Sequence, residues 1–213
     1  MKIQYVIKEL EKKYGIPEKV KCENPLDSLI KTILSQNTND INRDRAFDSL
    51  KDEFPKWADV IKAPTKKLAN AIRIGGLANI KAARIKSILH IIKEKTGALN
   101  LDYLKEMTNE EALNELYSFK GVGEKTAKCV LIFSLGRKVF PVDTHIHRLC
   151  QRMGFVRKGA TREETHFVMA EIVPEEKMYS FHINLILHGR KICTARKPEH
   201  EKCPLNKKCP KIL

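Results

Sequence analysis

Apolar residues recur along almost the whole chain with the spacing of an amphipathic α-helix. The first pattern puts four apolar residues on one face and stops at Gly15: Ile3, Val6, Ile7 and Leu10. Further helical patterns cover residues 25–34, 40–54, 57–61 and 80–96. Only residues 138–142 have an extended pattern, and this run is too short to found a sheet. We therefore predict an all-α protein.

Polar side chains mark where several of these helices begin. Asn24 stands directly before Pro25, as expected of an N-cap followed by proline at the first helical position. Thr65 is predicted to cap a helix that stops at Gly75 and Gly76. Two pairs have the Thr-x-x-Glu spacing of a capping box, Thr108 with Glu111 and Thr161 with Glu164.

Composition indicates a globular protein with a polyanionic partner. The chain has 213 residues, 42% of them hydrophobic and 31% charged, so it can bury a core in one domain or two small ones. The net charge of +14 favours a nucleic acid, because neutralised phosphates release counterions. The basic residues are spread out, which makes membrane binding the weaker interpretation. We find no transmembrane run and no signal peptide, and expect an intracellular monomer of the cytoplasm or nucleoid.

The six cysteines fall into two groups. Cys129 lies in an apolar run and is expected to be a buried thiol. Neither Cys22 nor Cys150 has neighbours that suggest a ligand role. The remaining three lie within seventeen residues at the C-terminal end, at Cys193, Cys203 and Cys209. In an intracellular chain this crowding indicates a metal or a cluster before disulfides.

A glycine-rich triplet separates two predicted helices within residues 116–148. Glycine tolerates positive φ and has no Cβ, so Gly121 and Gly123 on either side of Val122 allow a tight hairpin. Its backbone N–H groups, at the start of the helix from Glu124, would form a socket for a phosphate. Taken alone, the same triplet is also typical of an ordinary helix–helix turn.

A lysine and a carboxylate follow this hairpin. Lys125 lies in the first turn of the helix, where the dipole disfavours the ammonium form, and a neutral amine can attack a sugar carbon. Asp143 comes eighteen residues later and can stabilise positive charge on the sugar or assist proton transfer. The plainer interpretations are a surface lysine and an N-cap for the helix that follows Asp143.

The segments LxxFKGVGEKTA (residues 116–127) and VDTHIHR (142–148) resemble the helix-hairpin-helix DNA glycosylases, above all the endonuclease III branch. The resemblance runs from about residue 24 to the C-terminus. In that branch, the lysine at the position of Lys125 forms a Schiff base with the sugar and promotes β-elimination. The resemblance therefore implies a glycosylase with lyase activity, in which Lys125 and Asp143 are catalytic.

The resemblance also implies a two-lobed fold. A six-helix lobe would span residues 24–136, and residues 1–23 would join residues 137–213 in a second lobe. Double-stranded DNA would lie across the cleft between the lobes, with Lys125 and Asp143 facing each other from the two sides.

Further residues acquire a DNA-binding role through the resemblance. In the segment LSQNTND, Asn37 is the best match for a residue that fills the space of a flipped base, followed by Gln36, although helix C-capping also explains these amides. Leu77 matches the leucine of a second probe, which wedges beside the orphan base. Arg196 and Lys197 lie in a loop that could present them to phosphate.

The C-terminal segment matches the family's cluster motif at three of four positions. The family pattern Cys-x6-Cys-x2-Cys-x5-Cys binds a [4Fe-4S] cluster, and Cys193, Cys203 and Cys209 stand in register with it. The remaining position, within residues 193–209, is His200. Three thiolates and an imidazole can hold such a cluster, and the same set is common for zinc. An empty loop with three free thiols is the third alternative.

These features lead to one main functional prediction. We expect a bifunctional DNA glycosylase and abasic-site lyase that removes damaged bases, with oxidised pyrimidines as the default substrate. Tyr117 and Lys120 depart from the branch's commoner residues before the hairpin, which leaves the lesion undetermined. The alternative enzyme is a mismatch uracil or thymine DNA glycosylase. A non-catalytic hairpin DNA-binding module would need neither Lys125 nor Asp143.

Overall fold

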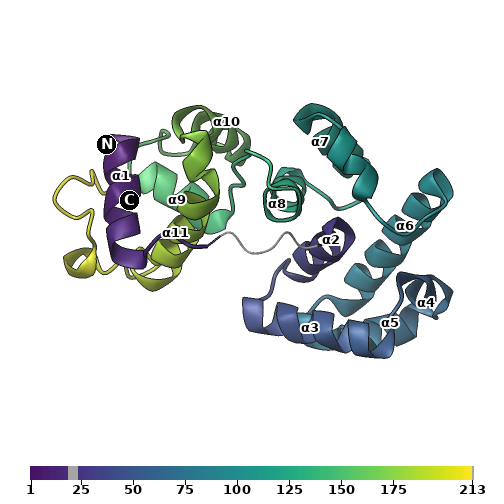
Figure 1. Ribbon diagram of the computed structural model, residues 1–213. Helices are drawn as coiled ribbons and strands as arrows, with labels where there is room; N and C mark the ends of the chain where they lie inside the picture. The colour runs from purple at the N-terminus through teal and green to yellow at the C-terminus, as the bar shows by residue number, and fades with distance from the viewer. Residues whose placement is uncertain (19–23, 213) are drawn as a thin grey trace. The chain divides into compact units, whose positions relative to one another are not determined.

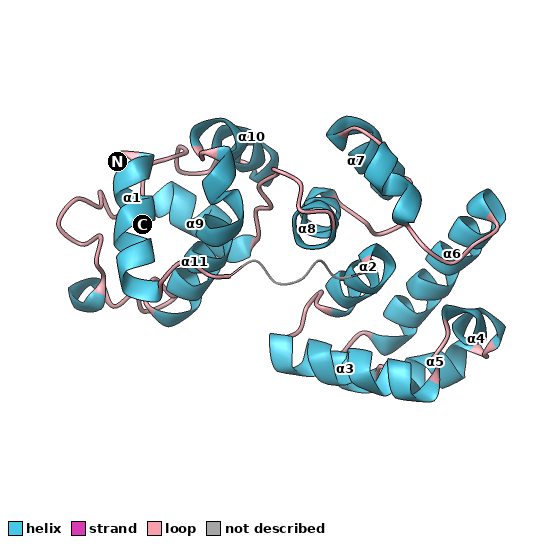
Figure 2. Ribbon diagram, viewed as in Figure 1, coloured by secondary structure: helices cyan, strands magenta, loops and turns pink. Residues whose placement is uncertain are grey.

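The structure is a computed structural model that describes residues 1–18 and 24–212. Every regular element in these residues is helical (Figure 2). The prediction of an all-α protein is therefore confirmed. Residues 138–142, which we predicted to be extended, belong to no helix or strand. Cys22 lies outside the described residues.

The helices predicted at residues 25–34, 40–54, 57–61 and 80–96 are all present, with ends that differ by at most two residues. The α-helices are α1 (Ile3–Tyr14), α2 (Pro25–Leu34), α3 (Asp40–Glu53), α4 (Trp57–Lys62), α5 (Thr65–Ala71), α6 (Ala78–Thr96), α7 (Asn109–Tyr117), α8 (Glu124–Ser134), α9 (Thr144–Arg152), α10 (Arg162–Ile172) and α11 (Met178–Lys191). Short 3-10 helices are η1 (Arg73–Gly75), η2 (Asp102–Glu106), η3 (Glu175–Lys177) and η4 (His200–Lys202).

The chain forms two compact units. The middle unit, Cys22–Arg137, contains α2 to α8, and the terminal unit contains α1 and α9 to α11 (Figure 1). The terminal unit combines Met1–Lys21 with Lys138–Leu213, because α1 packs against α11 near the other end of the chain. The middle unit is thus an insertion between the first helix and the rest of the terminal unit.

Helix α2 forms the centre of the middle unit. It packs against α8, α3 and α6, and its inward side chains have no exposed surface. These inward residues recur at helical spacing and are Leu26, Leu29, Ile30, Ile33 and Leu34. Full burial of each such side chain contributes roughly 1.5–3 kcal/mol. The last turn of α2 is therefore firmly anchored just before the polar segment that follows it.

The terminal unit is built around the crossing of α9 and α11. Gly189 of α11 lies at this crossing, where an added Cβ would be 3.0 Å from Cβ of His145 and 3.0 Å from Cδ1 of Leu149. Both distances are shorter than most real Cβ contacts, so a larger residue would require its neighbours to move by a few tenths of an ångström. This close approach positions α9, the helix that Asp143 caps.

Most of the predicted helix starts are confirmed. The Asn24 side chain accepts hydrogen bonds from the first turn of α2, and both capping boxes are complete. The prediction for Thr65 is wrong: Pro64 is the cap residue, no side chain caps the helix, and the Pro64 carbonyl accepts from Lys67 and Leu68 instead. Cys129 and Cys150 are both buried.

Candidate active site and nucleic-acid interface

Lys125 lies in the first turn of α8, where the sequence predicted it. Gly123 is the N-cap residue, and the Lys125 side chain is partly buried. Lys125 makes no hydrogen bond or ion pair with any residue that the structure describes, whereas Lys128, nearly one turn further on, binds Glu124 with an N–O distance of 2.6 Å. The two lysines of this helix therefore differ in their surroundings.

The hairpin uses its two glycines differently. Gly121 has φ of 84°, in the region that favours glycine, while Gly123 is extended, with φ of −101° and ψ of −179°. Val122 is only 6% exposed, and its N–H donates to the Phe119 carbonyl at 3.0 Å. The N–H of Val122 is thus used within the turn itself.

Asp143 is the N-cap of α9. Its Oδ1 accepts a hydrogen bond from the Ile146 N–H at 2.7 Å, which confirms the predicted capping. The carboxylate is partly buried. Burial lowers the pKa of the neighbouring His145, and the negative charge of Asp143 opposes this shift only in part. The imidazole of His145 is therefore neutral at neutral pH, with Nδ1 3.3 Å from the Arg148 guanidinium.

The first predicted probe begins at the end of α2. Asn37 is exposed and has φ of 54°, a left-handed conformation that asparagine tolerates better than most residues. The side chain of Gln36 has partners within the middle unit. Its Oε1 accepts from Nη1 of Arg84 at 2.6 Å, and its Nε2 donates to the Gly121 carbonyl at 3.3 Å. The two adjacent amides thus have different surroundings: Asn37 is exposed, and Gln36 connects this segment to the hairpin.

The second predicted probe is conformationally strained. Leu77 is the N-cap residue of α6, with φ of 50°, and is 49% exposed. A bulky residue in the left-handed region is an outlier that costs roughly 1–2 kcal/mol. Ile74 and Ile80, on either side of it in sequence, are also exposed. Both the strain and the exposed apolar surface oppose stability, and such features cluster at functional sites.

Replacing Leu77 with glycine should separate stability from function. Glycine adopts the left-handed conformation without strain, so Leu77→Gly should leave the free energy of unfolding unchanged or raise it by up to about 1 kcal/mol. Because Leu77→Gly lacks the leucine side chain, it should excise a paired lesion about tenfold more slowly. Leu77→Ala, which keeps the strain, should slow excision equally without the gain in stability. Denaturant unfolding with single-turnover excision checks both effects, and faster excision by Leu77→Gly would contradict the wedge role.

Sequence reasoning missed two residues of α6. Lys81 is only 1% exposed, and its Nζ donates to the carbonyls of Leu34 and Gly75 at 2.7 Å each. Arg84 binds Gln36, as described above, and an added Cβ at Gly121 would lie 2.1 Å from its Nε. The sequence did contain a sign that Lys81 is buried, because Lys81 lies four residues before Ile85 and so falls on the apolar face of α6.

The four predicted metal ligands line one pocket in the terminal unit. Cys193, His200, Cys203 and Cys209 border one hollow, which is partly open to solvent. Among residues 1–18 and 24–212, no group of three His, Cys, Asp or Glu side chains is arranged to hold a metal ion. The structure therefore brings the predicted ligands around a common hollow without drawing them together at a single point.

Arg152, at the end of α9, organises this loop. Its Nη1 lies 3.3 Å from Sγ of Cys193 and donates to the Thr194 carbonyl at 2.7 Å, and its Nη2 donates to the Ala195 carbonyl at 2.9 Å. Its own carbonyl lies 3.6 Å from Sγ of Cys209. The helix that Asp143 caps therefore contacts two of the predicted ligands.

A second histidine near the loop was not predicted. His188 of α11 is buried, and Nε2 lies 3.5 Å from Sγ of Cys203. Burial, with the positive charge of Lys13, lowers the pKa of His188 to about 4, so the ring is neutral at neutral pH. Burial also raises the pKa of the Cys203 thiol. A metal that binds this thiol must therefore displace its proton.

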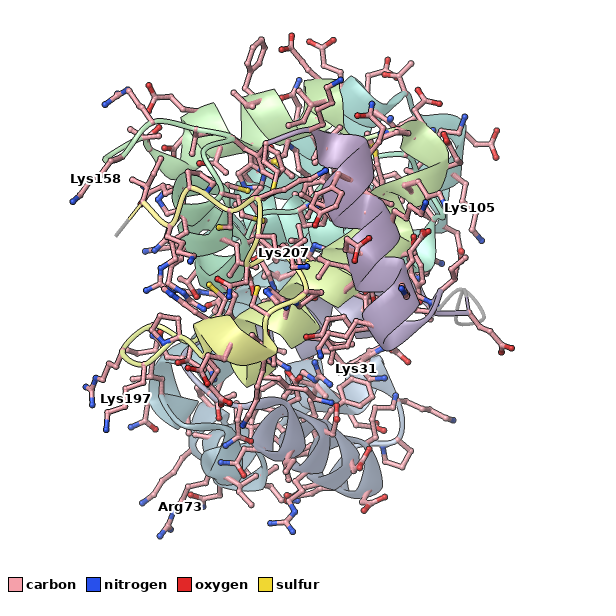
Figure 3. All side chains as sticks on the ribbon, turned by 90° about the vertical axis from the view of Figure 1, so that its left-hand side faces the viewer. Lys31, Arg73, Lys105, Lys158, Lys197 and Lys207 are labelled. Carbon is pink, nitrogen blue, oxygen red and sulfur yellow. The ribbon has the colours of Figure 1, made fainter. Side chains whose placement is uncertain are left out.

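Arg196 and Lys197 are both exposed on the same loop. Figure 3 shows the labelled Lys197 extending away from the ribbon. The loop turn is held by Thr194, whose hydroxyl donates to the Lys197 carbonyl at 2.7 Å. Both cations are therefore accessible on a turn with a defined backbone.

Comparisons with known proteins agree with this architecture. Residues 30–175 match the HhH-GPD superfamily of base excision DNA repair proteins. The chain is 33% identical to endonuclease III of Thermotoga maritima over 207 residues, which are 97% of this chain and 92% of that protein. It is 46% identical to an Arabidopsis thaliana protein named as a DNA glycosylase over 172 residues, or 81% of this chain, and spans 58% of that relative's length.

A solved structure gives the same result. A trapped endonuclease III–DNA covalent intermediate superposes with a TM-score of 0.85 at 28% identity, covering 98% of this chain and 94% of that one. The chain thus belongs to the HhH-GPD superfamily. Within it, the chain is an endonuclease III-like DNA glycosylase, which confirms the family predicted from the motifs. No helix in the described residues is long and apolar enough to cross a bilayer.

Proposed function

We propose that this chain is a bifunctional enzyme that removes a damaged base from duplex DNA and then cleaves the abasic strand. The observation that carries the proposal is Lys125, placed in the first turn of α8 directly after the hairpin, with no partner among the described residues. Support comes from the similar endonuclease III structure, which is a trapped covalent intermediate with DNA.

The chemistry requires a neutral amine and a carboxylate. The Lys125 amine attacks C1′, the bond from C1′ to the base breaks, and the electron pair leaves with the base, which takes up a proton. Loss of a proton from nitrogen and opening of the sugar ring give a Schiff base. Removal of a 2′ proton then expels the 3′ phosphate by β-elimination.

Asp143, at the start of α9, is positioned to assist these reaction steps. Its cap hydrogen bond uses Oδ1, and no described residue donates to Oδ2. That oxygen can stabilise the positive charge that develops on the sugar and receive a proton from Lys125. We propose that the middle and terminal units are the two lobes of the glycosylase and that DNA binds both of them.

Oxidised pyrimidines are the proposed substrate class. A mismatch uracil or thymine glycosylase is the second candidate, because Tyr117 and Lys120 differ from the residues common in the endonuclease III branch. The decisive experiment is a panel of duplexes, each with one defined lesion, incubated with the protein in the presence and absence of borohydride. Excision with covalent trapping on an oxidised pyrimidine supports the proposal. Excision without trapping, or on mismatched uracil or thymine alone, favours the second candidate.

We further propose that the terminal unit binds a [4Fe-4S] cluster through Cys193, His200, Cys203 and Cys209. The donor set suits iron, and all four side chains border the same hollow. The cluster would stiffen the loop so that Arg196 and Lys197 hold a DNA phosphate. Arg152 would keep the Cys193 segment in place.

Metal analysis after anaerobic purification should find iron and sulfide with visible thiolate-to-iron absorption. Imidazole is neutral where thiolate is anionic, so the reduction potential should be higher than that of the His200→Cys variant. Cys209→Ser is the control that should lower the iron content. Stoichiometric zinc without visible absorption would show that the loop binds a single ion. If the protein contained neither iron nor zinc, packing alone would hold the loop.

A further inference from the structure

A buried lysine connects the two segments that carry the predicted DNA probes. Lys81 is 1% exposed, and its Nζ donates to the carbonyls of Leu34 and Gly75 at 2.7 Å each. Burial lowers the pKa of Lys81, and the nearby Arg84 lowers it further. Both the ammonium and the neutral amine have enough hydrogens for two acceptors. Burying such a group is costly unless its hydrogen bonds are made.

Both acceptors are located where a helix ends and a probe begins. Leu34 is the last residue of α2, three residues before Asn37, and Gly75 is the last residue of η1, two residues before Leu77. Carbonyls in the last turn of a helix lack a partner within the helix, and a cation near a helix C-terminus is favourable. One side chain therefore satisfies the ends of two elements and sets the separation of the segments that follow them.

Arg84, nearly one turn further along α6, extends this connection to the hairpin. It binds Gln36 with an N–O distance of 2.6 Å, and Gln36 donates to the Gly121 carbonyl at 3.3 Å. Its guanidinium lies against Gly121, where an added Cβ would be 2.3 Å from Cζ of Arg84 and would require the arginine side chain to shift. All of these residues belong to the middle unit.

We propose that Lys81 and Arg84 are positioning residues for base flipping, which hold the two probes and the hairpin in one arrangement before DNA binds. The Lys81 amine donates to the backbone carbonyls of Leu34 and Gly75 and therefore acts on the probes through the backbone. If Asn37 and Leu77 are already ordered, inserting them does not also require loop ordering, and more binding energy remains to unstack the base. The role in flipping rests on the proposed glycosylase function, while the connection itself does not.

The first test is hydrogen exchange without DNA. Lys81→Met keeps the length of the side chain but leaves two carbonyls without a donor. The amides of Ser35, Gly75 and Gly76 are hydrogen-bonded within the two segments and report their local opening. We expect their exchange to accelerate by at least about tenfold, with little change in α8.

The matched control is another lysine of the same helix. Lys86 is partly buried and donates to the Ala63 carbonyl at 2.5 Å, and Ala63 belongs to neither of the two segments that carry the probes. Lys86→Met should leave exchange at Ser35, Gly75 and Gly76 unchanged. Equal acceleration in both variants, or none in Lys81→Met, would overturn the proposed connection.

The second test measures flipping. Lys81→Met should slow excision of a paired lesion by about tenfold, with covalent trapping on a single-stranded abasic site within about twofold of wild type. Equal loss on both substrates would mean that Lys81 only maintains the fold, and an unchanged rate on the paired lesion would remove its role in flipping. If the wild-type protein excised no lesion, the proposed function would fail, and the exchange experiment would still decide the connection.

Arg84→Met provides a second variant in case Lys81→Met does not fold. It removes the hydrogen bond to Gln36 and leaves Lys81 in place. We expect faster exchange at Ser35, with Gly75 and Gly76 unchanged, and a slower rate on the paired lesion alone. Unchanged exchange at Ser35 would exclude Arg84 from the connection.

Discussion

Lys125→Ala should abolish the covalent protein–DNA complex that borohydride traps during turnover. Without the amine no Schiff base can form, and losses on removing a covalent nucleophile reach several orders of magnitude. We expect the rate of strand cleavage to fall by at least about a thousandfold. The dissociation constant for abasic-site DNA should change only a few-fold, because many other basic residues contribute to phosphate binding.

The control is Lys120→Ala, which removes an exposed lysine from the other side of the same hairpin. At saturating protein it should be trapped to the same yield as wild type. The trapped yield is measured on denaturing gels, and DNA affinity by titration at fixed salt. A normal yield of trapped complex from Lys125→Ala would assign the Schiff base to another amine.

Asp143→Asn should separate capping from catalysis. Asparagine caps a helix as well as aspartate does, so the hydrogen bond to the Ile146 N–H and the stability of α9 should be retained. The amide carries no charge to stabilise the sugar cation and cannot receive a proton from Lys125. We expect single-turnover excision to slow by two to three orders of magnitude, roughly the loss seen when one transition-state interaction is removed.

Asp143→Ala is the comparison, because it removes both roles. It should lose about 1 kcal/mol of stability in addition to the same loss of rate. Chemical unfolding and excision are measured for both variants under one set of conditions. If Asp143→Asn were fully active while Asp143→Ala lost activity along with stability, capping alone would explain the residue.

Local signals in the sequence accounted for most of the secondary structure. Asn24, Thr108 and Thr161 cap their helices as predicted, because an N-cap interacts with backbone only two or three residues away. The error at Thr65 is also local, because the cap residue is Pro64, one position earlier, and its side chain makes no capping hydrogen bond. The family, too, could be predicted, because the hairpin, VDTH and the C-terminal cysteines are short motifs.

The arrangement around the probes could not be predicted in this way. The amide side chain of Gln36 is of a kind that can hydrogen-bond to bases. It instead binds Arg84 and Gly121, which are far away in sequence. Glycine is the residue type that most readily adopts positive φ, but Gly123 is extended. The left-handed conformation occurs at Asn37 and Leu77. Such outcomes depend on neighbours that only the folded chain provides.

The sequence alone thus determined most of the helices, most of their caps, the family and the positions of Lys125 and Asp143 at two helix starts. These properties depend on residue type and on separations of a few residues, which a linear pattern contains. Only the tertiary structure decided that Lys81 is buried and that its amine joins Leu34 to Gly75. A lysine is ordinarily a surface residue, and its burial is stable only because two carbonyls from distant segments meet at one point and satisfy it.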